Sequence, residues 1–207
     1  VAAEKQTVLT REERLVLQEL MNISFGDAGA ELEEVLGINI EINTPDVEVI
    51  PEEVSLASYL LEHRRHNCSF LLVEQRFWGD FSGVALMLLP QRYGASLVSD
   101  LSWFDSGRHE SASFEMLEQG AILEVGNILT GVCVGKIAEL LGTVVGYSPP
   151  RLRNGTEFDV DSEVSVILQT TFRCVRQEAG GRIYIAPDGR SLGWLRSAVS
   201  GYVELIS

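Results

Sequence analysis

The chain has little of the residue types that crosslink small proteins or bind metals. Its 207 residues include only three cysteines and three histidines. Cys68, Cys133 and Cys174 are odd in number and far apart, so we expect no disulfide framework and a reducing environment. The spacing His63-x2-His66-x-Cys68 is faintly metal-like, but arginines lie between the histidines and no second ligand cluster follows. We therefore expect a solvated loop there and no metal of the protein's own.

Positive charge is also scarce. Thirty acidic side chains outnumber sixteen basic ones, which gives a formal charge of −14. Such a surface repels phosphate backbones and anionic lipid, so nucleic-acid partners are disfavoured. No run of eighteen uncharged apolar residues occurs, so we expect no membrane insertion, and residues 1–11 do not contain the apolar block of a signal peptide. These features predict a cytoplasmic protein that meets a basic partner or is simply kept soluble by its carboxylates.

Common signatures of cofactor and nucleophile chemistry are missing as well. The sequence contains no glycine-rich phosphate loop, no nucleotide fingerprint and no Ser-His-Asp or Cys-His arrangement recognisable by spacing. We therefore expect no cofactor bound by the chain itself.

What the chain does contain is a pattern that occurs twice. The spacing E-x2-N-x22-P appears once in each half, 105 positions apart. The first copy is Glu19, Asn22 and Pro45, and the second is Glu124, Asn127 and Pro150. Repetition with the same internal spacing indicates a duplicated unit, and a duplicated unit implies a duplicated site.

The first copy begins on a predicted helix. The run from Thr10 to Glu13 has the pattern of a capping box, and Gly37 is placed as a C-cap. The predicted core-facing positions are Leu17, Met21, Phe25, Ala28, Leu32 and Val35. After the helix we expect strands at 38–42 and 47–50 and then, at 51–65, an irregular connection with or without a short helix. A hairpin of 69–73 and 82–89 with a longer loop and a helix at 91–103 follow.

The second half repeats this order. A long helix is predicted at 113–141, with Gly142 ending it and with inward candidates Ile122, Leu129, Cys133, Ile137 and Leu140. A strand at 143–147, a polar loop at 151–161, a hairpin of 164–176 and 182–186 that turns at Gly180-Gly181, a helix at 188–200 and an edge strand at 202–206 follow.

These elements predict one α/β (α+β) domain, residues 1–207, made of two repeats at about 10–104 and 111–206. The boundary is placed at 105–110. We expect pseudo-two-fold symmetry, with two long helices packed on a mostly antiparallel sheet, because hairpins dominate.

The motif residues share one face of each predicted helix. On a helical wheel Glu19, Asn22 and Gly26 lie opposite the apolar side, and their counterparts Glu124, Asn127 and Gly131 do the same. Asn and mid-helix Gly are poor helix formers, so their presence at matching places favours a functional surface. A bare glycine lets a partner approach closely, and Ile23 and Ile128 lie near this face. A solvated helix surface, or glycines that mark close packing of the two helices, is the structural alternative.

The residue types define what such a surface could do. An Asn side chain does not titrate near neutral pH, but its amide donates and accepts at once and can therefore orient water. A Glu one turn away can pair with a cation on a partner. Together they could position water for attack on a phosphoryl group held elsewhere, since phosphoryl transfer depends mostly on positioning and charge.

At these residues the sequence resembles the CheC/CheX/FliY family of chemotaxis phosphatases, over nearly the whole chain. The segment Glu124-Val125-Gly126-Asn127-Ile128-Leu129-Thr130-Gly131 is especially CheC-like. The resemblance implies a CheC-like fold and hydrolysis of the aspartyl-phosphate on the response regulator CheY. It implies that Glu19 and Glu124 pair with a lysine of the regulator, and that Asn22 and Asn127 orient the attacking water. Magnesium would belong to the regulator, and CheD, a receptor-modifying deamidase, is a further implied partner.

The chain departs from the family pattern in places. Leu15 and Gly120 stand where Asp or Ser is common, and Met21 replaces a small residue. The alternative to an enzyme is a non-catalytic binding module of the same fold, either a CheD adaptor or a flagellar-switch-like protein. Both Glu/Asn pairs are intact, which favours the enzyme and leaves open whether one or both sites act.

Overall fold

The structure, a computed structural model, describes residues 9–37, 39–51, 53–62, 69–94, 114–154, 166–174 and 179–206. The helices are α1 (Arg11–Leu36), α2 (Leu56–Glu62), α4 (Phe114–Leu140), α5 (Gly189–Ile206) and the short 3-10 helix η1 (Gln91–Tyr93). The strands are β1 (Ile40–Ile42), β2 (Asp46–Val49), β3 (Phe70–Trp78), β4 (Gly83–Pro90), β5 (Gly146–Tyr147), β6 (Arg151–Asn154), β7 (Val166–Cys174) and β8 (Ala179–Pro187).

The strands form one sheet whose described pairings are all antiparallel. Its order is β1-β7-β8-β4-β3-β5, with β2 also paired to β7 and β6 also paired to β3. The four longest strands, β3, β4, β7 and β8, occupy its centre, while short strands flank them on both sides. The predicted α+β fold, with long helices on a mostly antiparallel sheet, is therefore confirmed.

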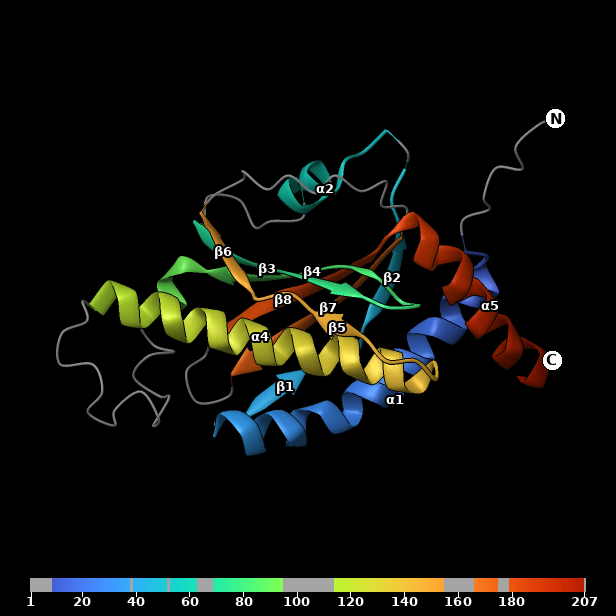
Figure 1. Cartoon of the computed structure of the whole chain (residues 1–207), viewed down its shortest axis with the longest axis horizontal. Helices are drawn as coiled ribbons and strands as arrows, with labels where there is room; N and C mark the ends of the chain where they lie inside the picture. Colours follow the sequence, from blue (N-terminus) through green and yellow to red (C-terminus); the bar gives the residue numbers. More distant parts are fainter. Residues whose placement is uncertain are drawn as a thin grey trace.

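Helices cover the sheet unequally on its two faces. The long helices α1 and α4 run side by side under one face with α5 at their end, and α2 lies over the other face (Figure 1). The larger core lies between the sheet and the long helices and includes Met21, Phe25, Leu129 and Phe172. A smaller core lies under α2 and includes Tyr59, Leu72 and Tyr184. Both faces of the sheet are thus buried, and the sides of α1 and α4 that point away from the sheet form part of the molecular surface.

The helix α4 has a strongly apolar composition. By length and composition alone it could cross a membrane, because one 18-residue window within it has a mean hydropathy of 1.5, although charged residues interrupt the helix. The core helix of a soluble protein passes the same test. Ile122, Val125 and Leu129 are buried against the sheet and α1, which accounts for the apolar composition.

Several expected boundaries are wrong. Residues 151–154, expected in a loop, form β6 and pair with β3, because their backbone completes the edge of that strand. The second hairpin does not turn at Gly180-Gly181; both glycines lie inside β8, opposite β7. Residues 202–206 continue α5 and do not form a strand. The first hairpin has a short connection because β3 extends to Trp78.

Two core assignments also change. Val35 is exposed and Leu36 is buried in its place, and Leu140 is only half-buried. Of the helix expected at 91–103, η1 accounts for the start. The rest of that segment, the boundary at 105–110 and the loop with His63, His66 and Cys68 lie outside the described residues.

Candidate functional site

The helix α1 begins and ends as its sequence predicts. The Glu13 backbone N–H donates to Thr10 Oγ1 at 3.2 Å, and the Thr10 N–H donates to Glu13 Oε2 at 2.7 Å, which completes a capping box. Gly37 ends the helix in the left-handed conformation, with φ 68°. Leu17, Met21 and other apolar residues are buried against the sheet, so the motif residues are presented on the opposite side.

The first motif copy lies on an open surface. Glu19, Asn22, Ile23 and Gly26 are all exposed, and the Ile23 side chain retains 57% of its accessible area. No described residue forms a hydrogen bond or salt bridge with Glu19 or Asn22. A methyl group added to Gly26 would meet nothing within 4 Å, so this glycine does not mark a helix-packing contact. The surface is therefore accessible to a partner.

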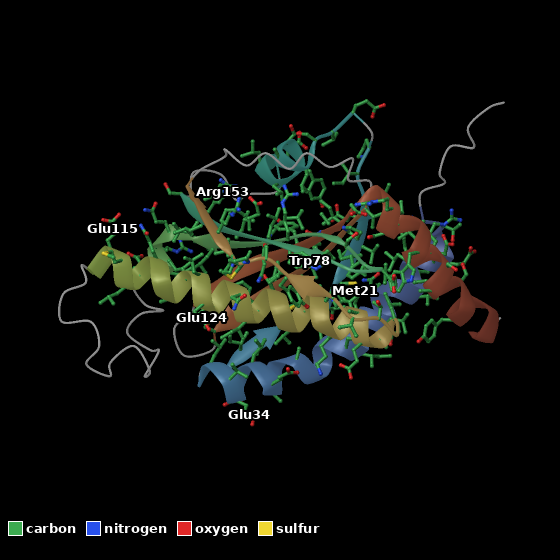
Figure 2. The ribbon with its side chains drawn as sticks, viewed as in Figure 1. Met21, Glu34, Trp78, Glu115, Glu124 and Arg153 are labelled. Atoms are coloured by element: carbon green, nitrogen blue, oxygen red, sulfur yellow. The ribbon has the colours of Figure 1, made fainter. Side chains whose placement is uncertain are left out.

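The second copy is differently placed. Glu124 is exposed near the middle of α4 (Figure 2), whereas Asn127, Ile128 and Gly131 are half-buried. A methyl group on Gly131 would also meet nothing within 4 Å. The second surface is thus exposed at Glu124 and has room for a methyl group at Gly131, but the Asn127 side chain reaches partly toward the sheet.

A buried glutamine on the sheet holds that asparagine. Gln75, on β3, is 2% exposed and donates from Nε2 to Asn127 Oδ1 at 2.7 Å. The same Nε2 donates to the Ser148 carbonyl at 3.0 Å. Sequence analysis missed Gln75. The available signal was a polar residue between Val73 and Phe77, at a strand position whose alternation predicts burial.

The motif prolines lie at corresponding points of the fold. Pro45 immediately precedes β2 and Pro150 immediately precedes β6. The Pro45 carbonyl accepts a hydrogen bond from Gln18 Nε2 at 2.9 Å, which ties the start of β2 to the turn of α1 before Glu19. In the second copy the Tyr147 hydroxyl donates to the Gly131 carbonyl at 3.2 Å, and burial raises the pKa of Tyr147 to about 12, so it remains a donor. The prolines thus take structural positions beside the helices.

The chemistry available at these surfaces is limited. Each has one exposed carboxylate and, one turn away, one primary amide, which is exposed at Asn22 and half-buried at Asn127. Such a pair can bind a cation and orient a small polar group. Within the described part of the chain, no three His, Cys, Asp or Glu side chains group closely enough to bind a metal ion.

Comparison with known proteins identifies relatives of this architecture. The CheC-like family matches residues 14–49. The flagellar motor switch phosphatase FliY of Bacillus subtilis (strain 168) is 26% identical over 165 residues, which cover 76% of this chain. The chain spans only 42% of the length of that relative.

Solved structures share the fold at low sequence identity. FliY of Thermotoga maritima superimposes with a TM-score of 0.63 at 21% identity, over 94% of this chain and 99% of that one. CheX in the CheX-CheY-BeF3-Mg+2 complex from Borrelia burgdorferi gives 0.51 at 18% identity, over 80% and 96%. The FliM middle domain from H. pylori gives 0.60 at 9% identity, over 92% and 99%.

Fold and helix surfaces thus define an α+β protein of the type seen in FliY and CheX, with long helices on a curled antiparallel sheet. The family match over residues 14–49, the FliY relative and these structures show that the chain is similar to CheC-type chemotaxis proteins.

Proposed function

We propose that this protein is a phosphatase that hydrolyses the aspartyl-phosphate of a CheY-type response regulator. The observation that carries the proposal is that each long helix places a Glu and an Asn one turn apart, with a bare glycine four residues beyond the Asn. Glu19, Asn22 and Glu124 are exposed, and Asn127 is half-buried. A relative is named a phosphatase, and CheX with the same fold has been captured with CheY and BeF3. The proposal extends these relatives' chemistry to this chain.

In the proposed reaction the helix carboxylate and amide have separate roles. Glu124 pairs with a lysine of the regulator and so aligns α4 with the regulator's active site. Asn127 enters that site and orients the water that attacks phosphorus, while magnesium remains a ligand of the regulator. Glu19 and Asn22 form the corresponding first site, and Ile23, Gly26, Ile128 and Gly131 contribute the contact surface. The protein supplies positioning and charge, which is what this reaction chiefly requires.

We also propose that the domain consists of two repeats related by a pseudo-two-fold axis. The pairing of β1 and β2 with β7 parallels the pairing of β5 and β6 with β3. Lys136 Nζ lies 3.1 Å from Glu31 Oε2, and these two residues are themselves 105 positions apart. Equivalent points of α1 and α4 therefore meet where the helices cross, as a two-fold axis requires.

The FliM-like structures support a second candidate, a non-catalytic binding module of the flagellar switch. The FliM middle domain has this fold at 9% identity, so the fold alone does not distinguish an enzyme from an adaptor. We also propose that the protein is cytoplasmic and binds CheD. A regulator-dephosphorylation assay separates the two candidates.

The assay follows the decay of a phosphorylated receiver domain in the presence of the wild type and of the Asn22→Ala/Asn127→Ala double variant. The wild type should accelerate decay, and the double variant should lose roughly a hundredfold in rate, as when a positioned catalytic amide is removed. Glu34→Ala, an exposed change elsewhere on α1, is the control and should act as wild type. A double variant as active as wild type would exclude the catalytic assignment, and an inactive wild type that still binds the receiver would favour the adaptor.

A further inference from the structure

Gln75 occupies a position that packing would fill with an apolar side chain. Its strand neighbours on the same face, Val73 and Phe77, both belong to the core beneath the long helices. Gln75 is as buried as they are, at 2% exposure, and its Oε1 is buried without a hydrogen-bond partner in the described part of the chain. A buried, half-satisfied amide destabilises a fold, so the residue is not explained by stability.

The contacts of Gln75 determine which way the Asn127 amide faces. The Ser148 carbonyl can only accept, so the Gln75 atom 3.0 Å from it must be the Nε2 donor. The same nitrogen lies 2.7 Å from Asn127, so the Asn127 atom there must be the Oδ1 acceptor. A backbone carbonyl thereby removes the usual ambiguity of an amide flip. Asn127 Nδ2 is left facing away from Gln75, and it is not among the described polar atoms that are buried without a partner.

The corresponding place beneath the first motif is occupied differently. The Ser148 N–H donates to the carbonyl of Arg76, and the Asn43 N–H donates in the same way to the carbonyl of Thr171. Gln75 directly precedes Arg76 and Thr170 directly precedes Thr171, so Thr170 is the counterpart of Gln75. Thr170 Oγ1 donates to the Asn43 carbonyl at 2.7 Å, just as Gln75 donates to Ser148, and Asn43 and Ser148 are 105 positions apart. Thr170 forms no hydrogen bond with Asn22. The strand-to-loop bond therefore occurs at both places, whereas among the described residues a bond from this strand position to the motif asparagine occurs only at Asn127.

From this geometry we infer that Gln75 is a positioning residue for the second site, fixing the Asn127 side chain with Nδ2 presented to the partner. No residue in the described part of the chain gives Asn22 such support, so the second site is the pre-organised one. This inference rests on the proposed function and names the residue that sets the orientation of its catalytic amide. Pre-organisation acts on the rate of the bound complex more than on its formation, because the amide need not be reoriented during the reaction.

The test uses an Asn22→Ala background, in which only the second site remains. Gln75→Met keeps the length of the side chain and removes its donors. Thr170→Val is the matched control, because it removes the corresponding strand-to-loop bond without a contact to either motif asparagine.

Gln75→Met should lower kcat for receiver dephosphorylation on the order of tenfold, in line with misplacement of a reacting group. Its KM, and its affinity for a beryllofluoride-loaded receiver domain, should stay within about twofold, because Glu124 and the contact surface are intact. Thr170→Val should match its parent in all three quantities.

An equal loss of kcat in Gln75→Met and Thr170→Val, or none in Gln75→Met, would overturn the inference. If Gln75→Met does not fold, Gln75→Asn, one methylene shorter, breaks the reach to Asn127 and carries the same expectation. A readout independent of activity is the side-chain amide signal of Asn127 in NMR, assigned by its loss in Asn127→Ala. It should shift in Gln75→Met and not in Thr170→Val, and an unchanged signal contradicts the positioning role. A shifted signal in a protein without phosphatase activity would instead sustain the positioning and reject the proposed function.

Discussion

At the scale of single residues, the glycines of the long helices differ in what surrounds them. Gly26 and Gly131 are open, with nothing within 4 Å of an added methyl group. Gly126, next to Asn127, is buried, and a methyl group there would lie 2.8 Å from Val73 Cγ1. Gly26 and Gly131 leave the helix surface free for a partner. Gly126 lets α4 approach β3, which brings Asn127 within reach of Gln75.

This difference predicts opposite effects of the same substitution. Gly131→Ala should raise the free energy of unfolding by about 1 kcal/mol, because alanine favours the helix and meets no neighbour. Gly126→Ala should lower it by about 1–3 kcal/mol, because the branched Val73 side chain has to move. Urea denaturation measures both.

Gly131→Ala should also weaken binding of the beryllofluoride-loaded receiver, because the added methyl group occupies the surface that the partner would approach. A stabilised variant that binds as wild type would show that this surface is not a contact.

The surroundings of a single residue can be predicted from the sequence only where a local pattern, such as helical periodicity, determines them. The exposure of Glu19, Asn22 and Glu124 follows from helical periodicity, and it is observed. The Asn127–Gln75 contact joins residues far apart in sequence, so it could not be predicted before the strand register was known. The assignment of catalytic roles to the motif residues stays a prediction.

At the scale of elements, α1 is fixed at its first turn by Glu13. This carboxylate closes the capping box with Thr10 and also lies 3.3 Å from Arg196 Nε on α5. Burial acts to raise the pKa of Glu13, but the hydrogen bond from Thr10 and the charge of Arg196 outweigh it, so the pKa is lowered below its ordinary value of 4.5. The helix that carries the first motif is thereby joined to the C-terminal helix.

The Glu13→Gln variant should be less stable than wild type at neutral pH, by up to about 1 kcal/mol, because glutamine retains the capping hydrogen bond but loses the charge that pairs with Arg196. A lowered pKa means that the folded state binds fewer protons than the unfolded chain, so the contribution is complete well above pH 4.5 and is lost as pH falls through the folded pKa. Urea denaturation at pH 7 and below pH 4 measures the difference. A gap that is constant with pH would show that the charge of Glu13 contributes nothing.

Elements with strong local signals were predicted well, and those set by tertiary pairing were not. The capping box and Gly37 define α1, and Gly142, with φ 72°, follows α4. Residues 151–154 have a polar sequence, Arg-Leu-Arg-Asn, and become a strand only because β3 offers them an unpaired edge. The helical period predicts a core position at Val35, but at the last turn of α1 Leu36 is the buried residue.

At the scale of the whole molecule, several features of the described part of residues 9–94 recur in residues 114–206, as the proposed duplication requires. The flanking strands, the crossing of α1 and α4 and the strand-to-loop hydrogen bonds correspond between halves. The surroundings of the two asparagines differ, because Gln75 reaches Asn127 while Thr170 does not reach Asn22. Under the proposed function, the two motifs should therefore differ in catalytic competence.

The most direct test of this account compares Asn22→Ala with Asn127→Ala, each in an otherwise unchanged chain, in the decay of one phosphorylated receiver domain. The account predicts that Asn127→Ala loses most of the acceleration, while Asn22→Ala retains most of it. Equal losses, or a greater loss in Asn22→Ala, would contradict it.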